Sequence, residues 1–228
     1  FLRPLGLRLI HALQLQIADA DISFCAPLSF NAQIKKGDVE VCDMFNLYRY
    51  ENMLYTIRMT GKEVKDYLEM SYALWTNQMK SPEDHIMLLD DTKDDNQRSG
   101  FKNFSFNFDS AAGILYTVDV TKPVGEKLTI LSMTDGRPFD LNKEYRVAVN
   151  SYRGNGGGEL LTKGAGIPVE QLKSRIIKST DKDLRYYMMQ YIERHGTVNP
   201  RPMSQWKFVP EEWAESAIIR DRKILFGH

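Results

Sequence analysis

The feature that most constrains the fold is the run "MLYTIRMTGKEVKDYLEMSYALW" (53–75), in which one hydrophobic period changes abruptly to another. Residues 53–60 alternate well enough to predict a strand. Thr60 and Glu63 then form a T-x-x-E capping box, which satisfies two backbone N–H groups of a first helical turn. One face of this helix follows a 3.6-residue period and is expected to lie in the core: Val64, Tyr67, Leu68, Ser71, Tyr72 and Trp75.

The rest of the chain reads as a mixture of strands and helices. Apolar runs and turn residues predict strands at 21–25, 104–109, 114–121, 128–133, 144–150 and 205–210, and helical periods predict helices at 5–17, 168–179, 181–196 and 211–223. Residues 78–103 are polar and show no sustained period, so we expect a long surface excursion there. This order predicts an α+β fold with a mixed or mostly antiparallel sheet flanked by helices. We expect one domain over 1–228, with 209–228 as a terminal helix or tail.

Composition excludes several classes of function. Lys+Arg and Asp+Glu both number 30, so the chain lacks the basic excess that DNA or RNA normally requires, although a single nucleotide is not disfavoured. No apolar run approaches the ~20 residues of a membrane span. The sequence begins without Met and its first residues form no signal peptide, which leaves open both a natural short protein and a part of a longer one.

The glycine-rich segment "NSYRGNGGGELL" (150–161) follows a predicted strand. A P-loop would need Lys after its last glycine, but Glu159 follows Gly158. A dinucleotide fingerprint beginning at Gly154 would need glycine at 159, so it fails at the same residue. Two interpretations remain, a turn without a ligand and a bare backbone that a ligand approaches closely.

No pattern in the chain predicts a catalytic or metal site. The four histidines are scattered, and Cys25 and Cys42 form no metal-binding pair. Asp90, Asp91, Asp94 and Asp95 could suggest calcium, but an EF-hand starting at Asp91 would place Lys93 at a ligand position. A solvated loop is therefore expected, with a novel metal site in a complete small hydrolase as the rival interpretation.

Three stretches together resemble a known family. "GDVEVCDMFNLYRYENMLYTIRMTGKEVKDYLEMS", "FNFDSAAGILYTVDVT" and "YRVAVNSYRGNGGGELL", in this order, are similar to the C-terminal domain of the exported 5′-nucleotidases, and most similar to the bacterial 2′,3′-cyclic-nucleotide 2′-phosphodiesterase/3′-nucleotidase branch. The resemblance covers roughly residues 5–208. Two departures, "CAPLSFN" without an Arg and Gly158 in place of an Asp, argue against 5′-monophosphate specificity and favour the cyclic-phosphodiesterase branch.

The resemblance implies a nucleoside-binding site. It matches Tyr50 and Tyr152 to two aromatics that sandwich the base, Asn52 to an Asn that contacts it, and Gly113 to a Gly whose backbone lies near the base edge. We also expect Gly156 and Gly157 to let Tyr152 reach the ligand without obstruction. Arg153 is a candidate phosphate contact, with a surface salt bridge as the alternative.

The resemblance also implies a division of labour. An N-terminal metallophosphatase domain of the same full-length protein would hold two divalent metals, and its signatures D-x-H and G-N-H-[DE] do not occur in these 228 residues. The chain alone is thus expected to hold no cofactor and to be inactive, as part of a periplasmic or otherwise exported hydrolase. The alternative is a non-catalytic structural or interaction domain whose aromatics all lie in the core.

Overall fold

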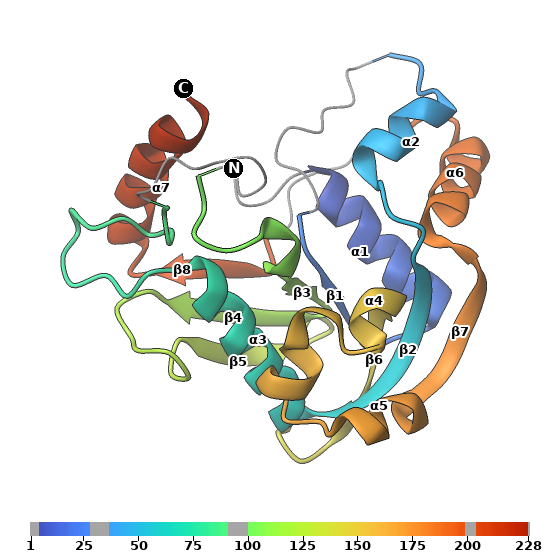
Figure 1. Cartoon of the computed structure of the whole chain (residues 1–228), viewed down its shortest axis with the longest axis horizontal. Helices are drawn as coiled ribbons and strands as arrows, with labels where there is room; N and C mark the ends of the chain where they lie inside the picture. The colour runs from blue at the N-terminus through green and yellow to red at the C-terminus, as the bar shows by residue number, and fades with distance from the viewer. Residues whose placement is uncertain (1–4, 28–36, 91–99, 199–203, 228) are drawn as a thin grey trace.

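The computed structural model describes residues 5–27, 37–90, 100–198 and 204–227 (Figure 1). Two sheets carry the fold. The first has five strands in the order β3-β1-β6-β2-β7, and the second has three in the order β5-β4-β8. The strands are β1 (Ile22–Cys25), β2 (Met53–Thr60), β3 (Ser110–Ala112), β4 (Ile114–Asp119), β5 (Leu128–Met133), β6 (Glu144–Asn150), β7 (Ile176–Asp183) and β8 (Trp206–Val209).

Both sheets are mixed. The β1–β6 and β4–β8 pairs are parallel, and the β1–β3, β2–β6, β2–β7 and β4–β5 pairs are antiparallel. The α-helices are α1 (Leu5–Ala18), α2 (Val41–Leu47), α3 (Gly61–Trp75), α4 (Ser151–Gly154), α5 (Val169–Arg175), α6 (Leu184–His195) and α7 (Glu211–Phe226). The α+β class and the mixed, mostly antiparallel sheet are therefore confirmed.

The strand-to-helix junction at Thr60 forms as its sequence predicts. The Thr60 side chain accepts from the Glu63 backbone N–H, and the Glu63 carboxylate accepts from the Thr60 backbone N–H at 2.7 Å. The predicted helical stripe from Val64 to Trp75 is buried along its whole length. It packs in one large apolar core with residues from both sheets.

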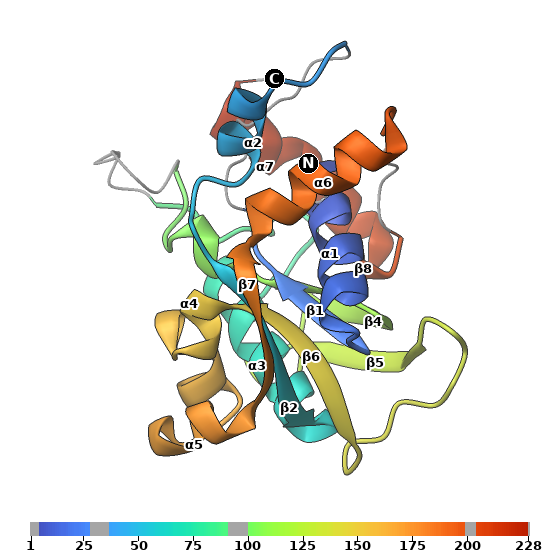
Figure 2. The same cartoon turned by 90° about the vertical axis from the view of Figure 1, so that its right-hand side faces the viewer.

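The two faces of the five-stranded sheet meet different helices. Along β2, Leu54 packs on the α1 side, whereas Ile57 and Met59 point into the core shared with α3. Figure 2 shows α1 on one side of the sheet, with α4 and α5 on the other. A second apolar cluster joins α1, α2 and α6, so these three helices stand together at one end of the molecule.

Three sequence-based expectations were wrong in part. Residues 104–109 form no strand. They make up an irregular segment that contains one 3-10 turn, Ser105–Asn107, and leads into β3. The helix expected over 168–179 ends at Arg175, and Ile176 begins β7, which pairs with the otherwise open edge of β2. The excursion at 78–103 also contributes to the core, since four of its described residues are buried: Met79, Ile86, Met87 and Phe101.

Candidate functional site

Tyr50 and Tyr152 lie at the same end of one strand pair. Leu54, near the start of β2, pairs with Asn150 at the end of β6. Tyr50 precedes β2 and Tyr152 follows β6, so both residues lie at the same end of this strand pair. The two side chains are 40% and 44% exposed, respectively. The alternative in which all the aromatics belong to the core is therefore wrong for these two residues.

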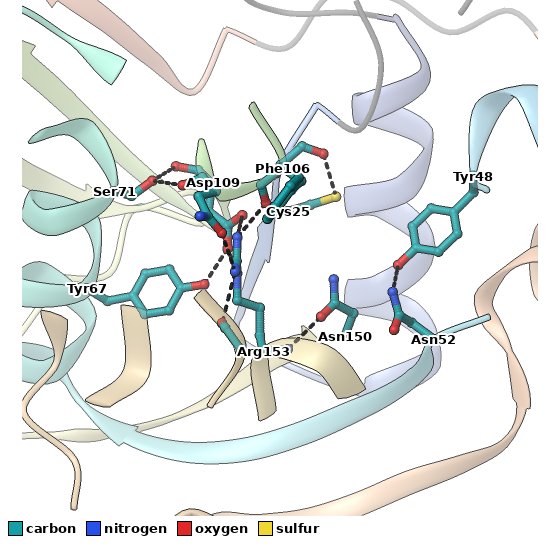
Figure 3. A network of polar contacts seen from close by, with 12 residues as sticks. Cys25, Tyr48, Asn52, Tyr67, Ser71, Phe106, Asp109, Asn150 and Arg153 are labelled. Carbon is teal, nitrogen blue, oxygen red and sulfur yellow. Dashed lines mark hydrogen bonds and ion pairs between the residues drawn. The ribbon is translucent and has the colours of Figure 1, made fainter. Parts of the chain in front are cut away.

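Asn52 is held in place from two sides. Its side-chain amide donates to the Tyr48 hydroxyl at 3.3 Å, and its backbone carbonyl accepts from the Leu184 N–H at 3.0 Å (Figure 3). Tyr48 is fully buried, and this burial raises the pKa of its phenol well above the usual range. A neutral hydroxyl therefore accepts from the half-buried side-chain amide of Asn52, which lies two residues after Tyr50 in the chain.

Arg153 is buried, which corrects both expectations for it. Only 3% of the residue is exposed, and its guanidinium forms a bidentate ion pair with Asp109, at 3.0 Å from Nε to Oδ2 and 3.1 Å from Nη2 to Oδ1. Its other three N–H groups reach the Asn107 Oδ1 at 2.9 Å, the Gly157 carbonyl at 3.0 Å and the Phe106 carbonyl at 2.6 Å. An Arg has five N–H donors, and all five are used. Arg153 is thus neither a phosphate contact nor a surface salt bridge.

The electrostatics of this ion pair favour charge despite burial. Desolvation opposes the guanidinium, but the Asp109 carboxylate more than offsets it and raises the pKa of Arg153. The Tyr67 hydroxyl also donates to the same carboxylate, and burial followed by the Asp109 charge raises the pKa of Tyr67. Because Tyr67 belongs to α3, Asp109 connects the helix that starts at the capping box to the segment after β6 (Figure 3).

The glycines after Tyr152 make room for side chains of the protein itself. A Cβ at Gly157 would lie 2.5 Å from the Tyr152 ring, and a Cβ at Gly158 would lie 2.1 Å from the Arg153 Nη1. Gly156 has a φ of +92°, and a Cβ there would lie 3.2 Å from a Leu172 methyl. The bare backbone therefore lets the Tyr152 ring and the Arg153 guanidinium pack closely. The expected direct roles of Gly156 and Gly157 toward a ligand stay a prediction.

Gly113 lies apart from the other predicted residues. It joins β3 to β4, and a Cβ there would lie 2.1 Å from the carbonyl oxygen of Asp21, which precedes β1. Since β1 and β6 run parallel, this end of β1 is opposite to the end at which β6 delivers Tyr152. A close backbone approach explains this glycine, and the geometry does not place it beside Tyr50 or Tyr152.

Sequence reasoning missed Phe106. Its ring is perpendicular to that of Tyr152, with centroids 6.4 Å apart and an interplanar angle of 83°. The ring of Phe104 stacks on that of Phe106, with centroids 5.1 Å apart. In the sequence, Asp109 is the residue that could have indicated this arrangement. It is a carboxylate at the end of an aromatic run, and a buried charge needs a partner.

Nothing in the described part of the chain gathers metal ligands. No group of three or more His, Cys, Asp or Glu residues within 5–27, 37–90, 100–198 and 204–227 could hold a metal ion. Asp91, Asp94 and Asp95 of the predicted acidic cluster lie outside these ranges. None of the described helices has the length and apolar character needed to span a bilayer.

Comparison with known proteins places the chain in a family. The family model "5′-nucleotidase, C-terminal domain" matches residues 7–163. The chain is 31% identical to the trifunctional nucleotide phosphoesterase protein YfkN of Bacillus subtilis over 80% of its own length and 12% of that protein. It is 28% identical to a 2′,3′-cyclic-nucleotide 2′-phosphodiesterase/3′-nucleotidase of Haemophilus influenzae over 78% of its length and 27% of that protein.

A solved structure agrees with this assignment at the level of the fold. The 5′-nucleotidase precursor of Thermus thermophilus superposes with a TM-score of 0.64 at 20% identity, covering 91% of this chain and 35% of the other. The chain thus spans about an eighth to a third of the proteins that it matches. By the match over most of its length, the chain belongs to the 5′-nucleotidase family, whose C-terminal domain it carries.

Proposed function

We propose that this chain is the nucleoside-binding domain of an exported nucleotide hydrolase, and that it holds a nucleobase between the rings of Tyr50 and Tyr152. The observation that carries the proposal is the position of these two half-exposed rings, about a hundred residues apart in the chain, at the same end of the β2–β6 pair. Every base has a π-face, so stacking accepts any of them and contributes about 1–3 kcal/mol per aromatic contact.

The proposed site is polar where a base needs it. The amide of Asn52 lies two residues from Tyr50 and is oriented by Tyr48, so it can pair with the edge of a stacked base. Two stacking contacts would together contribute about 2–6 kcal/mol, whereas even millimolar affinity requires about 4 kcal/mol. Binding of a nucleoside by this chain alone is therefore expected to be weak.

The proposal assigns hydrolysis to a second domain. The named relatives are nucleotide phosphoesterases, and the chain spans only 12% and 27% of two of them. A pair of divalent metals that activates water and stabilises the leaving oxygen is the usual means of phosphoester hydrolysis. We place that pair in an N-terminal metallophosphatase domain of the same full-length protein, with export to the periplasm or beyond, as the resemblance implies.

A titration with adenosine tests the clamp. Followed by NMR chemical shifts, binding by Tyr50→Leu and by Tyr152→Leu should fall below detection. Tyr186→Leu is a matched control, because Tyr186 is also 40% exposed but lies on α6. Wild-type affinity in both clamp variants would refute the proposal, as would an equal loss in the Tyr186 variant.

An activity assay tests the division of labour. The purified chain with manganese should not hydrolyse 2′,3′-cyclic AMP, and activity should require the metallophosphatase domain. Turnover by the chain alone that Asp94→Ala abolishes would instead support the rival interpretation, a complete small hydrolase with its own metal site.

A further inference from the structure

Phe106 has the position of a third aromatic residue in the proposed nucleoside site. Its ring is half-buried and stands at 83° to the Tyr152 ring, with centroids 6.4 Å apart. A base that stacks on Tyr152 is parallel to that ring and wide enough to extend past its edge. A neighbouring ring perpendicular to Tyr152 is therefore also perpendicular to the base, and the two meet in the edge-to-face geometry that aromatic pairs prefer.

The backbone around Phe106 is fixed by Arg153. The Nη2 group donates to the Phe106 carbonyl at 2.6 Å, and the Nη1 group donates to the Asn107 side chain at 2.9 Å. The same Nη1 group donates to the Gly157 carbonyl at 3.0 Å, and Gly157 lies against the Tyr152 ring. One guanidinium thus sets the positions of both rings relative to each other.

Three further contacts keep this arrangement rigid. The Asp109 carboxylate fixes the guanidinium, and the Ser71 hydroxyl of α3 donates to the Asp109 carbonyl at 2.7 Å. The Phe106 ring also stacks on Phe104, with centroids 5.1 Å apart. A ring held in this way loses little entropy when a ligand binds, so its contact contributes to affinity with little ordering cost.

We propose that Phe106 contacts the bound nucleobase as a third aromatic residue, and that Arg153 is the positioning residue that sets Phe106 against Tyr152. This inference rests on the proposed nucleoside-binding function. Phe106 would add a third ring to the two that stack on the base, and this ring would contact one edge of the base. The chemistry it recognises is a flat aromatic heterocycle, because perpendicular rings pair the C–H edge of one with the π-face of the other.

The test compares adenosine affinity among variants of the full 228-residue chain. Phe106→Leu should weaken binding about threefold to tenfold, as expected for one edge-to-face pair, whereas Phe106→Tyr should restore it. Phe139→Leu is the matched control, since Phe139 is also half-buried but stacks on Tyr145 near the start of β6, at the end opposite to Tyr152. It should bind adenosine as the wild type does. Thermal melting of each variant checks that the fold is kept.

A second measurement detects the contact directly. In protein labelled with ¹³C in its Phe rings, the resonance that Phe106→Leu removes should shift as adenosine is added, and the resonance that Phe139→Leu removes should move less. If Tyr152→Leu abolishes binding while Phe106→Leu binds normally and the Phe106 resonance does not move, the clamp stands and this inference is wrong. If Tyr152→Leu binds normally, the proposed function itself fails.

Discussion

Arg153 and Asp109, 44 residues apart in the chain, form a bidentate ion pair in which both residues are almost completely buried, at 3% and 2% exposure. The pair joins the segment after β6 to the segment before β3, and through Tyr67 it joins both to α3. A buried charge pair is tolerated only when its remaining donors and acceptors are satisfied, and here every N–H of the guanidinium has a partner. The segments that carry Phe106 and Tyr152 are thus joined to the core of the fold.

Removing the cation from this pair should be strongly destabilising. Arg153→Met leaves the buried Asp109 carboxylate without its counter-charge, with only the hydrogen bond from Tyr67, so we expect the free energy of unfolding to fall by about 3–5 kcal/mol. Urea denaturation measures the change. Arg137→Met is the control, because Arg137 pairs with Asp135 at the surface and its loss should have no measurable effect. Equal midpoints for the two variants would contradict the assigned role.

Gly158 should tolerate a methyl group far less well than another glycine with similar backbone geometry. Gly158 and Gly125 have φ values of +71° and +91°, so alanine would have a strained left-handed backbone at both positions. At Gly125 no atom lies within 4 Å of the added Cβ, whereas at Gly158 the Arg153 Nη1 lies at 2.1 Å. Gly158→Ala should therefore cost about 1–3 kcal/mol more than Gly125→Ala in urea denaturation. Similar losses would show that the guanidinium moves freely.

Gly157 allows a separate test of Tyr152, because its φ is not in the left-handed region and alanine meets no backbone strain there. The added Cβ would lie 2.5 Å from the Tyr152 ring, which must move. Adenosine affinity should fall while the urea midpoint changes little. Gly164→Ala is the control, since the three atoms nearest to its Cβ all belong to the Met70 side chain. An unchanged affinity in Gly157→Ala would mean that the ring position does not matter for binding.

Local signals predicted the parts of the fold in which neighbouring residues decide the structure. The capping box at Thr60 and the stripe from Val64 to Trp75 depend on residues within one helix, and both are confirmed. The strand from Ile176 could not be predicted in this way, because its formation depends on the open edge of β2. Residues 104–109 have the composition of a strand, but their backbone instead turns around Arg153.

In the candidate site, too, some features could be predicted from neighbouring residues and others depend on contacts between distant parts of the chain. The sequence indicated that Tyr50 and Tyr152 belong to segments that flank strands. The β2–β6 register then brings both segments to the same end of that strand pair. The burial of Arg153 could not be predicted, because its partner Asp109 is distant in the sequence and exposed arginines are far more common. Phe106 was hidden for the same reason, since only the fold places it beside Tyr152.

The capping box itself should contribute measurably to stability. In Thr60→Ala the Glu63 backbone N–H loses its acceptor, so we expect a loss of about 1 kcal/mol in the free energy of unfolding. Thr60→Ser keeps the hydroxyl and should remain close to wild type. If serine and alanine destabilise the protein equally, the packing of the threonine methyl matters here and the cap does not.

His11 of α1 should make stability depend on pH below neutrality. Its buried side chain faces the five-stranded sheet, with Nδ1 2.9 Å from the Ser23 hydroxyl of β1 and Nε2 3.4 Å from the Ser110 hydroxyl of β3. Because Ser23 donates its own proton to Gln14 at 2.6 Å, it accepts from Nδ1–H, which leaves Nε2 unprotonated to accept from Ser110. Burial lowers the pKa of His11 to about 4 from its usual 6.5, against a weaker opposing effect of the Asp109 charge.

The direction of the pH dependence follows from these two pKa values. Between pH 6.5 and about 4 the unfolded chain binds a proton at His11 that the folded chain does not, so the free energy of unfolding falls as the pH is lowered through this range. The difference corresponds to about 3 kcal/mol, lost progressively and complete near pH 4. Urea denaturation from pH 7 to pH 4 measures it, with His11→Gln as the comparison in which all other titrating groups are retained. The difference between wild type and variant should shrink as the pH falls, and a difference independent of pH would contradict a neutral His11 in the folded protein.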